Sequence, residues 1–197
     1  NEKEITIVEG WGIDDIGKYL EEQGIGTRRE FFALTGKKND ELRMTNYEFL
    51  VDKPVSVGLE GYLFPDTYRV QKDAKQEVVV QKMLENFDKK LTPEMRADIA
   101  ADGKSIFDIV RMASIIEAEV PHEEDRPIIA GILWKRLDIG MALQVDSTLN
   151  YATGGKNAAL TNNELKIDSP YNSYKYRGLP PTPIGNPGLS AIRAAIY

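Results

Sequence analysis

A glutamate near the end of a predicted helix is the residue best suited to acid/base chemistry. The helix spans Ser105–Glu119, and Ile106, Val110, Ala113 and Glu117 follow one another at spacings of four, three and four. Residues with this spacing share one face of a helix, so Glu117 continues an apolar stripe. Burial there would disfavour the ionised carboxylate, as a general acid requires. Two other roles fit the same spacing: Glu117 lies in solvent at a frayed helix end, or it pairs with an arginine.

Glu119 lies two residues further along the same helix. It therefore projects to another side and cannot easily share a proton with Glu117. Hydrogen bonding around the site, or simple solvation, is favoured for Glu119 over direct chemistry.

The composition excludes several other kinds of chemistry. The 197 residues include no cysteine and one histidine, His122, so thiol nucleophiles, thiolate metal sites and a His-rich zinc site are excluded. The acid/base of any enzyme here must then come from Asp, Glu, Lys or Tyr, and we expect neither a metal nor a cofactor. A net charge of −6 and scattered basic residues argue against nucleic-acid binding.

Two polar segments follow the predicted helix and could line a binding cleft. Residues Ala142–Thr148 alternate apolar and polar side chains, so an extended strand would place Gln144 and Asp146 on one face. Such a row suits the hydroxyl and acetamido groups of sugars, and it suits an ordinary exposed strand edge equally well.

The second polar segment, 168–181, is rich in turns and carries tyrosines at 171, 174 and 176. Tyrosine rings offer flat apolar surface for stacking, and Asn172 supplies an amide. The alternative is a structural loop stiffened by prolines.

Hydrophobic spacing and capping residues predict an α+β protein. The expected elements are a strand at Glu4–Glu9, helices starting near Gly12 and Thr27, a strand within Leu59–Val70, helices at Val80–Leu91, from Thr92, at Ser105–Glu119 and at Asp125–Asp138, a short helix near Thr161–Lys166 and a last helix from Leu189. No apolar run reaches the ~18–20 residues of a membrane span, and no signal-peptide pattern is present. Both ends resemble cut points, so we expect an anchor outside this chain.

Several stretches together resemble the YceG/MltG-like family of endolytic murein transglycosylases. They are Glu60-Gly61-Tyr62-Leu63-Phe64-Pro65-Asp66-Thr67-Tyr68, Ala113-Ser114-Ile115-Ile116-Glu117-Ala118-Glu119, Leu143-Gln144-Val145-Asp146-Ser147-Thr148, Ser169-Pro170-Tyr171-Asn172-Ser173-Tyr174, Gly178-Leu179-Pro180-Pro181 and Asn186-Pro187-Gly188. Each is weak alone, but their order and spacing make the combined match strong. The opening Ile7-Val8-Glu9-Gly10-Trp11 also resembles the start of the family's LysM-like subdomain.

The resemblance implies a small LysM-like βααβ subdomain at 1–72, followed at 73–197 by a mainly helical catalytic domain with short strands, truncated at its C-terminus. It implies a bacterial enzyme held by a single-pass anchor at the extracytoplasmic face of the membrane, with peptidoglycan strands as substrate and peptidoglycan synthases as candidate partners. The family's catalytic glutamate falls on Glu117. Substrate-binding roles fall on the polar and aromatic residues of the matched stretches, namely Glu60, Glu119, Gln144, Asp146, Ser147, Tyr171 and Asn172.

The implied reaction cuts the MurNAc–GlcNAc β-1,4 bond and leaves a 1,6-anhydro-MurNAc end. Glu117 would protonate the glycosidic oxygen and then take the proton of the MurNAc C6 hydroxyl, so no second enzymic carboxylate is needed, whereas ordinary glycosidases use a pair. Two alternatives stay open: a hydrolytic muramidase with the same glutamate, and a non-catalytic scaffold that binds peptidoglycan.

Overall fold

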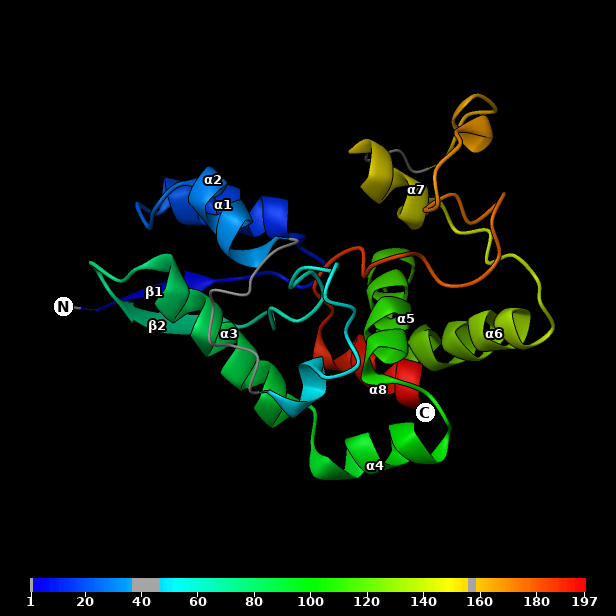
Figure 1. Ribbon diagram of the computed structural model, residues 1–197, viewed down its shortest axis with the longest axis horizontal. Helices are drawn as coiled ribbons and strands as arrows, with labels where there is room; N and C mark the ends of the chain where they lie inside the picture. Colours follow the sequence, from blue (N-terminus) through cyan, green and yellow to red (C-terminus); the bar gives the residue numbers. More distant parts are fainter. Residues whose placement is uncertain (1, 37–46, 156–158) are drawn as a thin grey trace.

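The computed structural model describes residues 2–36, 47–155 and 159–197 and shows an α+β protein (Figure 1). Its elements run in the order β1 (Glu2–Thr6), α1 (Ile13–Glu22), α2 (Arg28–Thr35), η1 (Glu48–Leu50), β2 (Thr67–Gln71), α3 (Gln76–Lys90), α4 (Pro93–Ala101), α5 (Ile106–Glu119), η2 (Glu123–Asp125), α6 (Arg126–Asp138), α7 (Asp146–Thr153), η3 (Glu164–Lys166) and α8 (Leu189–Ile196). None of the helices within these residues is both long and apolar enough to cross a membrane.

The two strands form one antiparallel pair, with Ile5 opposite Tyr68. Helices α1 and α2 lie between them in sequence and pack against each other. Thr27 caps α2 by accepting the backbone N–H of Glu30, as the capping pattern predicts. The order β, α, α, β is therefore present, while the finer likeness to a LysM domain stays a prediction. The second strand is shorter than predicted, because residues 59–66 form turns and bends rather than continuing the ladder.

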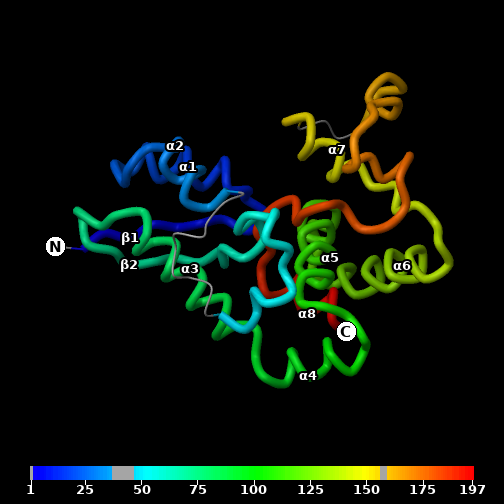
Figure 2. Tube along the Cα trace, in the orientation of Figure 1, coloured from blue at the N-terminus to red at the C-terminus, as the bar shows by residue number. Residues whose placement is uncertain are grey.

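Helix α5 is the centre of the helical part and contacts α4, α6, α7 and α8 (Figures 1 and 2). It is buried on nearly every side from Phe107 to Ile116. The face predicted to carry Val110, Ala113 and Glu117 is buried as expected, and most other faces of the helix are buried too, because a helix that is apolar all round lies inside the core. Ser105 caps the helix by accepting the N–H of Asp108, and Asp108 bonds back to the N–H of Ser105, as expected of a capping box.

The strand predicted at 142–148 is wrong, as are the short strands predicted for the catalytic domain, since no residue after β2 in the described ranges forms one. Residues 141–145 are irregular, and α7 starts at Asp146. Gln144 has a φ of +56°, in the left-handed region that interrupts a strand. The segment instead bonds to the tyrosine-rich loop, through Gln144 N–H to the Ser173 carbonyl at 3.0 Å and Val145 N–H to Ser173 Oγ at 3.0 Å.

Asn186 ties the N-terminal segment to the rest of the protein. It is fully buried, and its Oδ1 accepts the N–H groups of Gly61 and Leu63, both at 2.9 Å. Its Nδ2 donates to the Trp11 carbonyl at 2.9 Å and to Glu60 Oε1 at 3.0 Å. Four hydrogen bonds from one amide thus join segments that lie 125 and 175 positions away in sequence.

Replacing Gly61 by alanine should destabilise the protein strongly. Gly61 has a φ of +92°, and a Cβ there would lie 2.6 Å from both Pro183 and Val110. Left-handed strain of roughly 1–2 kcal/mol then adds to overpacking of about 1–3 kcal/mol. Chemical denaturation should show a loss well above that of Gly103→Ala, because Gly103 has a similar φ of +69° with open space around it. Equal losses in the two variants would refute the packing argument.

Candidate functional site

Glu117 forms a buried ion pair. Its Oε1 lies 2.7 Å from Arg126 Nη2, and its Oε2 accepts the backbone N–H of Gly188 at 3.0 Å. The two side chains are only 7% and 5% exposed. Both carboxylate oxygens therefore have partners, and the bond to the guanidinium is of the strong, charge-assisted kind. Of the three roles open from the sequence, these contacts match pairing with an arginine.

The chain turn after α5 creates this pair. Helix α5 ends at Glu119, η2 follows, and α6 starts at Arg126, which folds back so that its Nε also donates to the Val120 carbonyl at 3.2 Å. Sequence reasoning missed Arg126, since it lies nine positions after Glu117, beyond the end of the helix, and no helical spacing relates the two. Pro127 at the start of α6 was the available signal that a new helix brings Arg126 close.

Glu119 is exposed and lies on a different side of α5, about 200° around the helix axis from Glu117. Its Oε1 accepts the backbone N–H of Ser147 at 2.9 Å, at the N-terminus of α7. Its Oε2 has no hydrogen-bond partner among the residues that the structure describes. Glu119 therefore presents one carboxylate oxygen to whatever occupies the space beside it.

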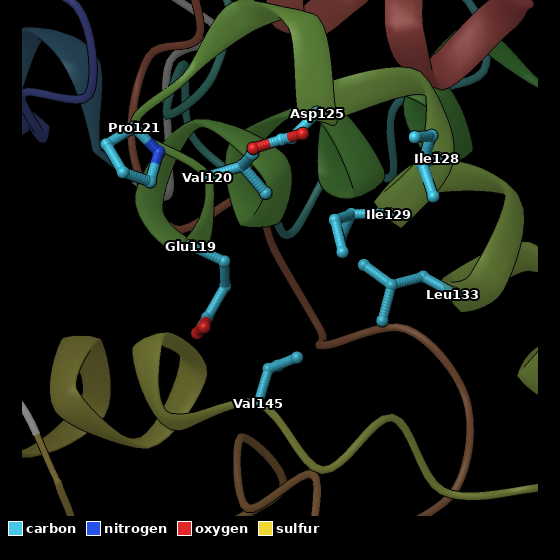
Figure 3. A pocket seen from close by; sticks show the side chains of 8 residues that line it. All are labelled: Glu119, Val120, Pro121, Asp125, Ile128, Ile129, Leu133 and Val145. Atoms are coloured by element: carbon cyan, nitrogen blue, oxygen red, sulfur yellow. The ribbon is translucent and has the colours of Figure 1, made fainter.

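That space is a cavity of about 350 Å³ between α5, α6 and the start of α7 (Figure 3). Its walls are mostly apolar and comprise Glu119, Val120, Pro121, Asp125, Ile128, Ile129, Leu133 and Val145. In Figure 3 the Glu119 side chain extends toward α7 and away from Asp125. Glu119 is thus separated from the other carboxylate in the wall.

The start of α7 adds polar groups next to Glu119. Asp146 accepts the hydroxyl hydrogen of Tyr174 at 2.5 Å. Burial raises the pKa of Tyr174 to about 12, with Asp146 and Glu119 adding to the effect, so the tyrosine stays a donor. The Oγ of Ser147 is buried without a hydrogen-bond partner among the described residues. Gln144 is exposed at its strained backbone position. Ser147 thus bonds to Glu119, with Asp146 next to it at the start of a helix rather than on a strand, and Gln144 lies in the irregular segment just before that helix.

Glu60 lies at a second place in the fold, buried at the N-terminus of α1. Its two oxygens accept the Ile13 N–H at 3.1 and 3.2 Å, and they also accept the Asn186 amide and the Tyr151 hydroxyl. Burial raises the pKa of Glu60 to about 7, against the lowering effect of its hydrogen bonds, and the charge of Asp15 adds to the rise. Sequence reasoning missed Tyr151 and the role of Asn186, because both contacts join segments remote in sequence.

The loop that carries Tyr171 and Asn172 could bind a ligand or serve only as structure, and the two residues differ in which of these roles they fit. Asn172 is fully buried, and its Nδ2 donates to the carbonyls of Leu165 and Ile167 at 3.0 and 2.8 Å. Its Oδ1 accepts the Tyr174 N–H, so this amide holds the loop together and offers nothing to a ligand. Tyr171 is partly exposed, with its hydroxyl 2.7 Å from Thr182 Oγ1, and it lines a cavity of about 930 Å³ together with Glu60.

No cluster of three or more His, Asp or Glu side chains suited to a metal ion occurs in the described ranges. The polar groups of the site are instead carboxylates, amides and hydroxyls beside apolar walls. Such groups can transfer protons and bind an uncharged, hydroxyl-rich ligand.

Comparison with known proteins identifies the family to which this chain belongs. The sequence profile of the YceG-like family matches residues 1–197. The chain belongs to this family, as the sequence predicts.

Its relatives include the endolytic murein transglycosylases of Streptococcus pneumoniae serotype 2 strain D39, 34% identical over 210 residues, and of Bacillus subtilis strain 168, 34% identical over 203 residues. Each alignment covers 98% of this chain, but the chain spans only 38% and 56% of those two proteins. A crystal structure of a YceG-like protein from Listeria monocytogenes has the same fold, with a TM-score of 0.86 at 31% identity over 98% of this chain and 66% of that one.

Glu60 should make stability depend on pH. Its pKa is about 7 in the folded protein, above the ordinary value of 4.5 for a glutamate in water, so its contribution to the free energy of unfolding is full below about pH 4.5. The contribution is lost as the pH rises through about 7, when the buried carboxylate must ionise. Denaturation should be measured for wild type and Glu60→Gln across this range. The free energy of unfolding of wild type should fall relative to that of Glu60→Gln as the pH rises. A difference that stays constant with pH would contradict the assignment.

Removing Arg126 should destabilise the protein by about 3–5 kcal/mol, the range found when one partner of a buried ion pair is lost. The variant Arg126→Met leaves the Glu117 carboxylate buried with only the Gly188 N–H. A matched control is Arg69→Met, which breaks the exposed pair with Glu4, where the side chains are 74% and 59% exposed. Urea denaturation should show a far smaller effect for the control. Similar small losses in both variants would show that the Glu117–Arg126 pair is not structural.

Proposed function

We propose that this chain carries the catalytic part of an endolytic murein transglycosylase. Membership of the YceG-like family and the names of relatives aligned over 98% of the chain support this activity. The proposed substrate is the glycan strand of peptidoglycan, cut at the MurNAc–GlcNAc β-1,4 bond to leave a 1,6-anhydro-MurNAc end. An exposed carboxylate, Glu119, with one oxygen free of hydrogen-bond partners among the described residues and set beside a mostly apolar cavity, is the observation that carries the proposal for the site.

Glu119 is the better candidate for the acid/base, although the sequence favoured Glu117. A catalytic acid must touch the glycosidic oxygen, and Glu119 has an oxygen without a partner at the cavity. Both oxygens of Glu117 are engaged, one by the buried Arg126 guanidinium and the other by the Gly188 N–H, so neither is open to a substrate. Glu117 is then a positioning residue: it fixes the end of α5 and the start of α6, the two helices that flank the cavity.

The proposed reaction needs one carboxyl group used twice. Protonated Glu119 donates its proton to the glycosidic oxygen as the bond to MurNAc C1 breaks, and the GlcNAc C4 hydroxyl leaves. The Glu119 carboxylate then takes the proton of the MurNAc C6 hydroxyl, whose oxygen bonds to C1 and closes the anhydro ring. No water is consumed, and Glu119 ends protonated, ready for the next cleavage. The Ser147 N–H orients the carboxylate throughout.

A hydrolytic muramidase is the second candidate, because Asp125 lines the same cavity. Paired carboxylates are the usual arrangement for hydrolysis of a glycosidic bond, but the Glu119 side chain extends away from Asp125 (Figure 3). A non-catalytic scaffold is disfavoured by the presence of an accessible glutamate at a cavity. The membrane anchor, the extracytoplasmic location and synthase partners are proposals that rest on the family resemblance alone.

Glu119→Gln should lower cleavage by roughly 10²–10⁴-fold, the usual cost of losing proton transfer. Glu117→Gln should retain most cleavage per folded molecule, with the folded fraction measured by circular dichroism. Mass spectrometry of uncrosslinked glycan strands incubated with each protein provides the measurement. Anhydro-MurNAc ends made by wild type and Glu117→Gln, but not by Glu119→Gln, are the expected result.

Other outcomes have distinct meanings. A folded but inactive Glu117→Gln beside an active Glu119→Gln would return the catalytic role to Glu117. Reducing ends in place of anhydro ends would establish hydrolysis, and Asp125→Asn would then test the second carboxylate. A wild-type protein that binds strands without cutting them would support the non-catalytic scaffold as its function.

A further inference from the structure

A cavity of about 930 Å³ lies apart from the Glu119 cavity and takes no part in the proposed chemistry. Its walls come from parts of the chain that are remote in sequence: the start of α1, α2, the end of α7 and the tyrosine-rich loop. Figure 1 shows α1 and α2 on one side of the upper end of α5 and α7 on the other. The volume lies within the range of about 300–1,000 Å³ that ligand-binding clefts occupy.

Aromatic rings line this cavity from both sides. Phe32 of α2 is 61% exposed, and Tyr151 of α7 is 38% exposed. The Tyr151 ring lies 5.5 Å, centroid to centroid, from that of Tyr171. Aromatic faces left open to solvent in a cavity offer flat apolar surface, which suits the apolar faces of pyranose rings.

The polar groups of the cavity fit an uncharged, hydroxyl-rich ligand. Asp14, Asp15 and Ser169 provide acceptors at its wall, and no lysine or arginine side chain is among the described residues that line it. Asp14 is already paired with Arg28, which does not line the cavity, so an anionic ligand would meet Asp15 with no lining cation to compensate the charge. Hydroxyl and acetamido N–H groups can donate to these acceptors without a charge penalty.

Helix α7 connects this cavity to Glu119. Ser147, which binds the Glu119 carboxylate, precedes Tyr151 by four residues, so the two lie about 6 Å apart along the helix axis. A strand bound at Glu119 and extending along α7 would therefore reach the aromatic cavity.

We propose that this cavity is a second saccharide subsite, which holds an N-acetylhexosamine unit of the same strand away from the scissile bond. Tyr151 is the main stacking surface, and Phe32 closes the opposite wall. The inference rests on the proposed function for its substrate class. It explains how a cut inside a strand is favoured, because sugars beyond the reacting pair contribute to binding.

Binding without turnover tests the subsite directly. In the Glu119→Gln background, affinity for a β-1,4 hexasaccharide of N-acetylglucosamine is measured by calorimetry. Tyr151→Ala and Phe32→Ala should each raise Kd by about 5- to 10-fold, as loss of an aromatic contact does. Tyr151→Phe keeps the ring and should bind within about twofold of the parent, well below the change set by a lost aromatic contact. Val55→Ala changes a 93% exposed apolar side chain that does not line the cavity and should have no effect.

Cleavage assays separate this inference from the proposed function. With long strands, Phe32→Ala should raise KM while leaving kcat nearly unchanged, because Phe32 does not line the Glu119 cavity. Tyr151→Ala should also raise KM, but it removes the hydrogen bond to Glu60 that holds α7, so its kcat is not used in the test. Active wild type together with unaltered Kd and KM in both variants would overturn the subsite, as would the absence of saturable hexasaccharide binding. Hexasaccharide binding that depends on Phe32 and Tyr151 in a protein without cleavage activity would overturn the proposed function and keep the subsite. Phe32 lies outside the buried core, so its variant keeps the test valid if Tyr151→Ala fails to fold.

Discussion

The buried contact between Glu60 and Asn186 is the constraint on which both cavities depend. Glu60 receives hydrogen bonds from the first turn of α1, from α7 through Tyr151, and from Asn186, which itself bonds to Trp11, Gly61 and Leu63. A buried carboxylate is costly unless such donors surround it. Its donors come from different parts of the chain, so satisfying this one carboxylate fixes α1 and α7 relative to each other. The aromatic cavity lies between the elements held in this way.

Glu117 is a second buried carboxylate whose hydrogen bonds hold separate segments together, here beside the Glu119 cavity. Glu117 joins the end of α5 to the start of α6 through Arg126 and to the start of α8 through the Gly188 N–H. Helix α5 is largely enclosed by the core, and at its final turn Glu119 is exposed to solvent. The two glutamates, two residues apart, thus differ in what their carboxylates contact. Glu117 is buried in an ion pair, and Glu119 is accessible at the cavity.

The sequence predicted the helices and their caps well, because capping residues and hydrophobic spacing act within a few residues. Ser105, Thr92 and Thr27 accept the N–H groups expected of them. It failed where distant segments decide the conformation. The alternation at 142–148 suggests a strand, but Ser173 supplies the partners and Gln144 takes a left-handed φ. Likewise, the stripe ending at Glu117 gave no sign of Arg126, which is close only because the chain reverses after α5.

The same limit explains why the sequence could name candidate site residues but could not assign their roles. Glu60, Glu119 and Tyr171 line a cavity, and Ser147 bonds to Glu119. The polar atoms of Asp146 and Asn172 are instead bonded to residues of the tyrosine-rich loop and the segment before it. A motif specifies residue types, and burial decides which of their polar atoms remain available. Helix α7 is where these constraints meet. Its first turn holds Glu119, and its last turns carry Tyr151, bonded to Glu60 and facing the aromatic cavity. A shift of α7 would therefore alter both places at once, so binding at one place and orientation of the carboxylate at the other share a single structural support.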